Sequence, residues 1–245
     1  LYQARNTSTA GRVFPNGRQG NLDALAQTYA PYDVVGLQEC DPGSMRSGFS
    51  NQSEYLARKA NFPFTSHQAT RRISHFASSG NALLSRLQPQ RIEHSILPSR
   101  IPGRGVLMAE FGTPDHEWHL AITHLSLSAK ARRLQIAYLS ELLAGKPRVV
   151  LMGDFNITWD DLDVWDPIAL AGTIHCTDEE RAHFNALLDL GLHDAFRLFE
   201  QAPKSYSWWD YREFAFKRNR GLRIDHILVS SALVKHVNAC VIDKT

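Results

Sequence analysis

Short apolar segments rich in Val, Ile and Leu alternate with amphipathic segments along the chain. The apolar segments are bounded by Gly, Pro or Asp, which is typical of buried strands, and they cover residues 33–38, 81–85, 105–111, 118–123, 148–152 and 222–229. Helical periodicity appears between them, at residues 22–29, 53–60, 129–143 and 178–190, the last with Thr177 as N-cap and Glu180 three residues on. Segments rich in Gly, Ser, Pro and Arg predict surface loops at residues 42–48, 70–80, 97–103 and 202–205. The pattern predicts an α/β fold in which sheets are flanked by helices.

The length and the charge of the chain limit its possible domain organisation and ligands. The chain has 245 residues and 43% hydrophobic content, which suits one sizeable domain over residues 1–245 better than two small ones. Its 27 basic and 25 acidic residues give a net charge of +2. A nucleic-acid-binding surface would therefore have to be a local feature rather than a property of the whole chain.

Cysteine usage and hydropathy bear on the compartment. Cys40, Cys176 and Cys240 are too few and too far apart for a disulfide framework or a zinc site, so we expect buried, unreactive thiols and a reducing environment. No apolar run approaches the roughly 20 residues of a membrane span, and the N-terminus lacks a signal-peptide pattern. We expect a cytoplasmic protein with no membrane partner.

Polar side chains follow the ends of two apolar strands. The strand at residues 33–38 runs into Glu39, and the strand at residues 148–152 runs into Gly153, Asp154, Phe155 and Asn156. Charged groups at the ends of buried strands are costly unless they face a cavity, a partner or a metal. Carboxylate and amide oxygens suit Mg²⁺, so Glu39, Asp154 and Asn156 are candidate ligands. Each residue alone would be interpreted as a turn residue, but the three together favour a site.

His124 and Asp225 are two further candidate catalytic residues. The strand at residues 118–123 ends at His124, which could transfer a proton near neutral pH, as phosphodiester hydrolysis requires. The alternative is a core histidine bonded to the backbone. Asp225 lies within an apolar run, where a lone carboxylate would be expensive, so we expect it to pair with a histidine or to position one.

Five segments resemble motifs of the endonuclease/exonuclease/phosphatase superfamily, in the order that the family has them. They are Leu-Gln-Glu at 37–39, Gly-Asn-Ala-Leu-Leu-Ser-Arg at 80–86, Thr-His-Leu at 123–125, Gly-Asp-Phe-Asn at 153–156 and Arg-Ile-Asp-His at 223–226. The resemblance implies a four-layered α/β sandwich of two packed mixed sheets flanked by helices. It also implies Mg²⁺, with Mn²⁺ as the alternative, at the metal ligands Glu39, Asp154 and Asn156, and the catalytic residues His124, Asp154, Asn156 and Asp225. Asn81 would donate to a phosphate, although an Asn after a Gly is as readily a turn residue.

The two parts of the chain resemble different branches of this superfamily. From Asp154 onward, residues 161–167, 187–192, 194–197, 206–212 and 219–225 resemble exonuclease III, the bacterial apurinic/apyrimidinic endonuclease. Before it, residues 51–52, 80–86, 101–105 and 123–125 resemble the general phosphodiesterase branch, which includes pancreatic-type deoxyribonuclease and sphingomyelinase relatives. The active-site tyrosine of exonuclease III has no counterpart here, whereas His124 matches the histidine of the other branch. Divergence or recombination near the strand at residues 148–152 would explain this composite.

Residues 207–223 interleave aromatic and basic side chains, which suits stacking on a sugar or base and neutralising phosphates. The expected DNA contacts are Trp208, Trp209, Arg212, Arg220 and Arg223. Because neighbours on a strand face opposite sides, we expect one tryptophan to be buried and the other, by resemblance to exonuclease III, to receive an abasic deoxyribose. The sequence therefore predicts a Mg²⁺-dependent DNA hydrolase of the AP endonuclease and 3′-exonuclease type. Its partner would be duplex DNA with abasic or 3′ lesions, and we expect a monomer.

Two other interpretations stay open. One is a general metal-dependent phosphodiesterase acting on nonspecific DNA, nucleotides or phospholipid head groups. The other is a catalytically impaired DNA-binding module, because the family's first Asn-bearing strand and its final Ser-Asp-His are not identified. Asn6 lacks an apolar strand setting, and strand alternation would turn His226 away from the side that Asp225 faces. With its terminal strands incomplete, the chain as written is expected to have little activity.

Overall fold

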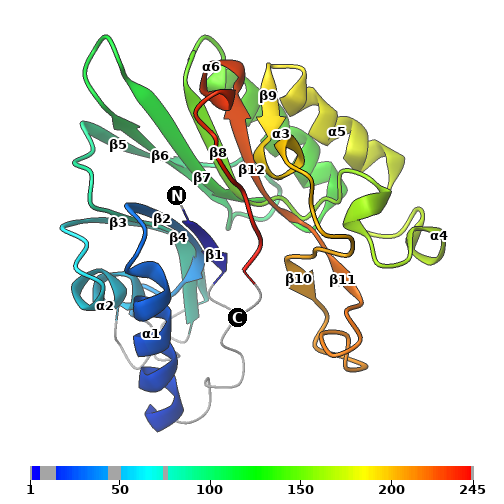
Figure 1. The fold of residues 1–245 in the computed structure, drawn as a ribbon, viewed down its shortest axis with the longest axis horizontal. Helices are drawn as coiled ribbons and strands as arrows, with labels where there is room; N and C mark the ends of the chain where they lie inside the picture. Colours follow the sequence, from blue (N-terminus) through cyan, green and yellow to red (C-terminus); the bar gives the residue numbers. More distant parts are fainter. Residues whose placement is uncertain (1, 6–14, 44–50, 74–76, 244–245) are drawn as a thin grey trace. The chain divides into compact units, whose positions relative to one another are not determined.

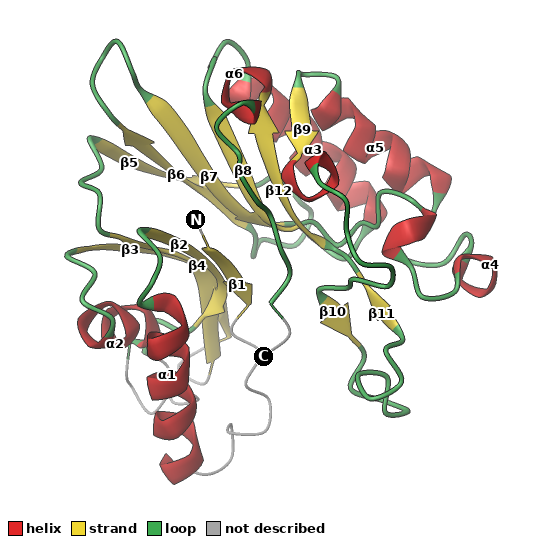
Figure 2. Ribbon diagram, in the orientation of Figure 1, coloured by secondary structure: helices red, strands yellow, loops and turns green. Residues whose placement is uncertain are grey.

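The computed structural model describes residues 2–5, 15–43, 51–73 and 77–243, so Asn6 lies outside the described residues. The described residues combine β-strands with α-helices in both halves of the chain, which confirms the predicted α/β class (Figures 1 and 2). The chain divides into two compact units. Unit 1 comprises Leu1–Leu97 and Ile101–His124, and unit 2 comprises Pro98–Arg100 and Leu125–Thr245. A single domain over residues 1–245 stays a prediction.

Unit 1 contains a mixed sheet in the order β1-β2-β4-β3, in which β1 is parallel to β2 and the other pairs are antiparallel. Strands β5, β6 and β7 form a separate antiparallel series. The elements are β1 (Tyr2–Arg5), α1 (Pro15–Tyr29), β2 (Val34–Cys40), α2 (Gln52–Lys59), β3 (Phe64–Ile73), β4 (Ala77–Ser85), β5 (Arg91–Ile96), β6 (Gly105–Phe111) and β7 (Trp118–His124).

Helices α1 and α2 cover one face of the mixed sheet of unit 1. Their apolar side chains, among them Leu22, Tyr29 and Leu56, pack with Val35 and Leu37 of β2 in one buried cluster. Figure 2 shows the two helices beside this sheet. The apolar runs that the sequence shows at β2 and β4 are therefore explained by burial of the sheet between layers.

Unit 2 is built on three antiparallel strands, with β12 between β8 and β9. Helix α5 begins with the predicted capping box, in which Thr177 and Glu180 each accept a hydrogen bond from the other's backbone N–H. The elements are α3 (Ala129–Leu143), β8 (Val149–Asp154), η3 (Asp161–Asp163), α4 (Pro167–Leu170), α5 (Asp178–Leu188), β9 (Leu192–Asp194), η4 (Ala195–Leu198), β10 (Trp208–Trp209), β11 (Gly221–Leu222), β12 (Asp225–Ser230) and α6 (Ser231–Val234).

Several expectations about elements were wrong in detail. Residues 70–80 are not a loop throughout, because β3 continues to Ile73 and β4 begins at Ala77. Strand β5 was missed because its side chains are mostly exposed and so carry no apolar run. The expected strand at residues 222–229 is two strands, interrupted at Arg223 and Ile224, whose backbone groups bond to Asp163 and Phe155 instead.

Two further expectations concern membranes and thiols. Among the described residues, no helix combines the length and the apolar character needed to cross a bilayer. The three cysteines are free thiols; Cys40 and Cys176 are buried, and Cys240 is half-buried.

Candidate active site

Glu39 lies near the end of β2, where the strand departs from regular pairing. The register with β4 shifts between Leu37 and Cys40, and Glu39 has a φ of 59°. A left-handed backbone at a non-glycine residue costs about 1–3 kcal/mol, and such irregularities re-aim a side chain out of the strand's alternation. The neighbouring Gln38 is fully buried, whereas Glu39 is half-buried. The irregularity thus leaves a carboxylate partly accessible at the end of an otherwise buried strand.

His124 ends β7 and is 5% exposed. Its Nδ1 lies 2.8 Å from Nη1 of Arg104, within unit 1. A guanidinium can only donate, so Nδ1 accepts and the ring proton of the neutral imidazole is on Nε2. The Nδ1 of His124 therefore bonds to a side chain rather than to the backbone, and the charged Arg104 fixes the orientation of the ring.

Asn81 has a structural role, and its assignment as a phosphate donor was wrong. It is 2% exposed, and its Nδ2 donates to Oε1 of Gln68 at 3.1 Å and to the carbonyl of Gly105 at 2.9 Å. Gln68 in turn donates through Nε2 to the carbonyls of Ser95 and Val106. Both amide hydrogens of Asn81 are thus in use, one to a residue of β3 and one to a residue of β6, which leaves none for a ligand.

Two glycines make this network of unit 1 sterically possible. A Cβ on Gly80 would lie 1.8 Å from the backbone oxygen of Gln68, and a Cβ on Gly105 would lie 2.6 Å from the Nε2 of the same residue. No side chain fits at either position without displacing Gln68. The Gly-Asn sequence at residues 80–81 therefore reflects close packing of strands.

In unit 2, β8 ends in a turn that orients Asp154 and Asn156. Gly153 has a φ of 155° and Asn156 a φ of 54°, which allow the chain to leave the strand sharply. The backbone N–H of Asn156 donates to Oδ1 of Asp154 at 3.0 Å, and Nδ2 of Asn156 donates to the carbonyl of Leu125 at 2.9 Å. The ring of His175 contacts the carbonyl of Asn156 at 2.7 Å. Both candidate residues are therefore buried and held by short contacts.

Asp225 begins β12 and is the register partner of Asp154 on β8. Directly opposed residues of an antiparallel pair present their side chains on the same face. His226 is instead opposite Gly153, and it is buried against Phe155 and Phe184. The structure thus brings Asp154, Asn156 and Asp225 together at one end of this strand pair and turns His226 to the other face.

Arg223 was expected to contact DNA, and the structure corrects this. It is 1% exposed, its Nε and Nη2 donate to the Asp163 carboxylate at 2.6 and 3.0 Å, and Nη2 also donates to Asp194 at 2.7 Å. Nη1 contacts Nδ1 of His226 at 3.1 Å, and Arg197 forms a second ion pair with Asp163. Arg223 therefore neutralises two buried carboxylates and lies inside unit 2, away from solvent.

Trp208 and Trp209 form β10, and the expectation that one of them is buried was wrong, because both are half-buried. Trp208 packs against the buried cluster of Val164, Cys176, Leu222 and Ile224. Trp209 donates through Nε1 to Asn219 at 3.2 Å and packs edge-on against Phe216. Both tryptophans thus remain partly accessible to solvent.

The loop between β10 and β11 carries the remaining candidate DNA contacts. Arg212 is exposed and paired with Asp210, and Arg220 is half-buried with its guanidinium over the ring of Trp165. Three aromatic side chains on this loop are strongly exposed: Tyr211, Phe214 and Phe216. Figure 1 shows the loop projecting beyond its two strands. Exposed aromatic rings beside cations favour nucleic acid as a ligand of this loop.

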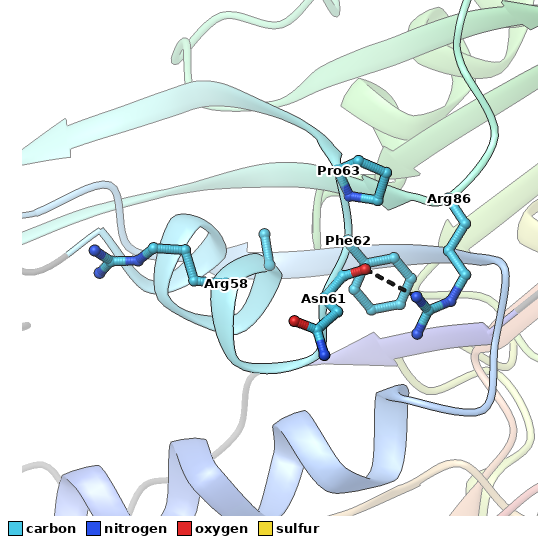
Figure 3. Close-up of a pocket in the computed structure, with 6 residues that line it drawn as sticks. Arg58, Asn61, Phe62, Pro63 and Arg86 are labelled. Atoms are coloured by element: carbon cyan, nitrogen blue, oxygen red, sulfur yellow. Dashed lines mark hydrogen bonds between the residues drawn. The ribbon is translucent and has the colours of Figure 1, made fainter.

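A surface pocket in unit 1 is structural rather than catalytic (Figure 3). The Arg86 guanidinium on its wall donates to the carbonyls of Ala30, Tyr32, Ala60 and Asn61, which follow the ends of α1 and α2. It also lies over the Phe62 ring, 4.7 Å from its centroid. Arg86 therefore caps two helix ends and holds them to β4, and it has little left with which to bind a ligand.

Comparisons with known proteins identify the family of the chain. Residues 13–245 match the Endonuclease/Exonuclease/phosphatase family. Exodeoxyribonuclease III of Haemophilus influenzae is 31% identical over 89% of this chain and 85% of that protein. DNA repair nuclease APEX1 of Danio rerio is 32% identical over 64% of this chain and 53% of that protein. The solved structure of the 3′ phosphatase NExo from Neisseria, bound to a product DNA hairpin, has a TM-score of 0.71 at 25% identity, and the match covers 96% of this chain and 87% of that chain. The chain belongs to the Endonuclease/Exonuclease/phosphatase family and is a hydrolytic enzyme of the nuclease type.

Proposed function

We propose that the protein hydrolyses DNA phosphodiester bonds with a divalent metal ion, as an AP endonuclease and 3′-exonuclease. The observation that carries the proposal is the placement of Asp154, Asn156 and Asp225 at one end of the β8–β12 pair. These are polar groups of the kind that orient water and phosphate oxygens. The names of the relatives, a DNA exonuclease, a DNA repair nuclease and a 3′ phosphatase, support DNA as the substrate.

The donor chemistry fits a hard cation. Glu39, Asp154 and Asn156 offer carboxylate and amide oxygens, and we propose them as ligands of Mg²⁺, with Mn²⁺ as the alternative. Among the described residues, no group of three or more His, Cys, Asp and Glu side chains has metal-binding geometry, so the proposed set relies on an amide oxygen. A bound divalent ion would neutralise charge on the phosphate and stabilise the leaving oxygen.

The protein side chains would share the remaining work. Asp154 would orient the attacking water and accept its proton. Asn156 has one amide hydrogen committed to Leu125, which leaves a second hydrogen to donate to a phosphate oxygen. His124, with its proton on Nε2, would stabilise the negative charge that builds on the phosphate or protonate the leaving group. Asp225, opposite Asp154, would support the orientation of these groups.

We propose that Trp208, Trp209, Arg212 and Arg220 bind the DNA, and that a tryptophan face receives an abasic deoxyribose. Their accessibility and the projecting aromatic loop support this assignment. The substrate would be duplex DNA with abasic or 3′ lesions, acted on by a monomer.

Cleavage of three matched duplexes in Mg²⁺ tests the assignment. One duplex carries an abasic analogue, one a 3′ phosphate at a nick, and one neither. We expect faster turnover of both lesions than of the intact duplex, and loss of turnover in excess EDTA that returns with Mg²⁺. Equal rates on all three duplexes would contradict the proposed preference for lesions. Cleavage that persists in EDTA would contradict the proposed metal dependence. DNA binding without any turnover would instead favour the impaired DNA-binding module.

A general phosphodiesterase is the second candidate, and His124 with its partner Arg104 favours it because that histidine motif resembles the wider branch. It predicts hydrolysis of a simple diester, such as bis(p-nitrophenyl) phosphate, that survives a double Trp208→Ala, Trp209→Ala change. The DNA-repair assignment predicts that the double variant loses preference for the abasic duplex.

A further inference from the structure

Arg132 is a fully buried cation on helix α3, one turn from its N-terminus. Its Nη1 donates to the carbonyls of Ser126 and Leu127, each at 2.7 Å. Its Nη2 forms an ion pair with Glu180 of α5, which is 1% exposed. The guanidinium therefore connects the segment before α3 to a second helix.

Gln135, one turn further along α3, holds the same segment from a second point. Its Oε1 accepts from the Ser126 N–H and its Nε2 donates to Ser126 Oγ, both at 2.9 Å. Every hydrogen-bonding group of Ser126 is thus bonded to Arg132 or Gln135. We call Arg132 and Gln135 the α3 clamp.

The clamped segment also contacts the two candidate residues at the end of β8. The Leu125 N–H donates to the carbonyl of Asp154 at 2.8 Å, and the Leu125 carbonyl accepts from Nδ2 of Asn156 at 2.9 Å. His124 immediately precedes Leu125 in the chain. Residues 125–127 are therefore fixed on one side by α3 and on the other by the turn that carries Asp154 and Asn156.

A role in stability alone accounts poorly for this arrangement. Burying an Arg–Glu pair removes two charges from water, and a well-packed apolar pair between α3 and α5 would hold the helices at least as firmly. An apolar pair could not bond two consecutive backbone carbonyls. The charged donors are thus suited to fixing a peptide segment in one geometry.

We propose that Arg132 and Gln135, with Glu180 holding Arg132 in place, are positioning residues that set the Asn156 amide and the start of the segment after His124. This inference rests on the proposed function, because it assigns these residues to the geometry of that reaction. None of the three would touch the substrate.

Steady-state kinetics on the abasic duplex tests the inference with Arg132→Met, Arg132→Lys and Gln135→Met. A small misplacement of reacting groups lowers the rate by up to about 100-fold, so we expect that loss in kcat for R132M with KM changed by less than about 3-fold. R132K keeps one charged donor and should recover part of the loss. The matched control is Arg133→Met, an exposed neighbour on the same helix that should behave as wild type. Folded R132M and Q135M with wild-type kcat would overturn the inference.

Amide hydrogen exchange gives a reading that does not need activity. The N–H groups of Leu125 and Ser126 should exchange at least about 10-fold faster in Q135M and R132M, whereas Leu151 in β8 should not change. Gln135→Met leaves no unpaired buried charge, so exchange in Q135M still tests the inference if R132M does not fold. Unchanged exchange at both amides in folded Q135M would overturn the inference. A wild-type protein that cleaves no duplex would contradict only the proposed function, because the exchange result would stand.

Discussion

Asp225 lies directly opposite Asp154 in the antiparallel ladder of β12 and β8, so both carboxylates occupy one face of this strand pair. Like charges in opposed positions repel and destabilise a sheet. The fold retains the arrangement at the end of a strand that is otherwise apolar. A repulsive pair at such a position is typical of a site that trades stability for function.

Replacing one of these carboxylates should separate activity from stability. Asp225→Asn keeps the side-chain shape and removes the repulsion, so we expect kcat to fall by about 100- to 10,000-fold while the free energy of unfolding stays equal or rises. Duplex cleavage and urea unfolding measure the two effects. Asp189→Asn, at an exposed position after α5, is the control that should change neither. Near-normal kcat in D225N would contradict the assignment of Asp225.

The loop between β10 and β11 should account for part of the salt dependence of DNA binding. Arg212→Ala removes one exposed cation, and each phosphate contact contributes roughly 0.9 to the slope of log K against log salt. We therefore expect the slope to become shallower by about that amount, measured by fluorescence anisotropy between low and physiological salt. Arg91→Ala removes an equally exposed cation from β5 and serves as control. Equal slopes for R212A and wild type would show that Arg212 makes no phosphate contact.

Arg223 should matter for stability rather than for DNA affinity. Arg223→Met leaves Asp163 and Asp194 buried without their main cation, so we expect a loss of about 3–5 kcal/mol in the free energy of unfolding. Arg220→Met, at a half-buried position on the loop, should cost at most about 1 kcal/mol. Chemical denaturation of both variants provides the comparison. A loss below 1 kcal/mol for R223M would be incompatible with the buried network.

The pH dependence of stability should report on Asp194. Burial by itself would raise the pKa of Asp194, but the neighbouring His226 ring and the charged, hydrogen-bonded guanidinium of Arg223 hold this pKa well below its ordinary value. Since the folded pKa is depressed, the stabilisation is complete above the unfolded pKa of about 4 and is lost as the pH falls below it. The stability difference between wild type and Asp194→Asn should therefore be constant from pH 7 to 5 and shrink below pH 4. A difference that instead grows toward acid would require the opposite shift.

The sequence predicted those elements whose apolar pattern is itself set by burial. Strand β6 and helix α3 begin and end at the predicted residues. Strands β3 and β5 were missed because they are rich in polar residues, and a strand with a polar face leaves no apolar run. The class of fold could be predicted, whereas the strands with polar faces could not.

The site residues also differ in whether the sequence alone could reveal their roles. Positions 39, 154 and 156 could be identified as candidates because polar residues at the ends of apolar runs are unusual, and position 225 because a carboxylate within an apolar run is unusual. Arg223 could not be assigned, because its burial depends on carboxylates 60 and 29 residues away in the sequence. The α3 clamp did leave a local signal: Arg132 and Gln135 occupy the same helical face as the buried Ile136 and Leu139.

The interlocked amides and glycines of unit 1 couple three sequence positions to one another and fix a fourth. Alanine at position 105 would need a shorter side chain at position 68, and shortening that side chain would strip Asn81 of an acceptor. No change of side chain at position 68 would make room for alanine at position 80, because the atom in the way is the backbone oxygen of Gln68. In a randomised library of this protein, surviving clones should vary positions 68, 81 and 105 jointly while keeping glycine at position 80, so a map of pairwise tolerance would reveal how β3, β4 and β6 pack without a structure.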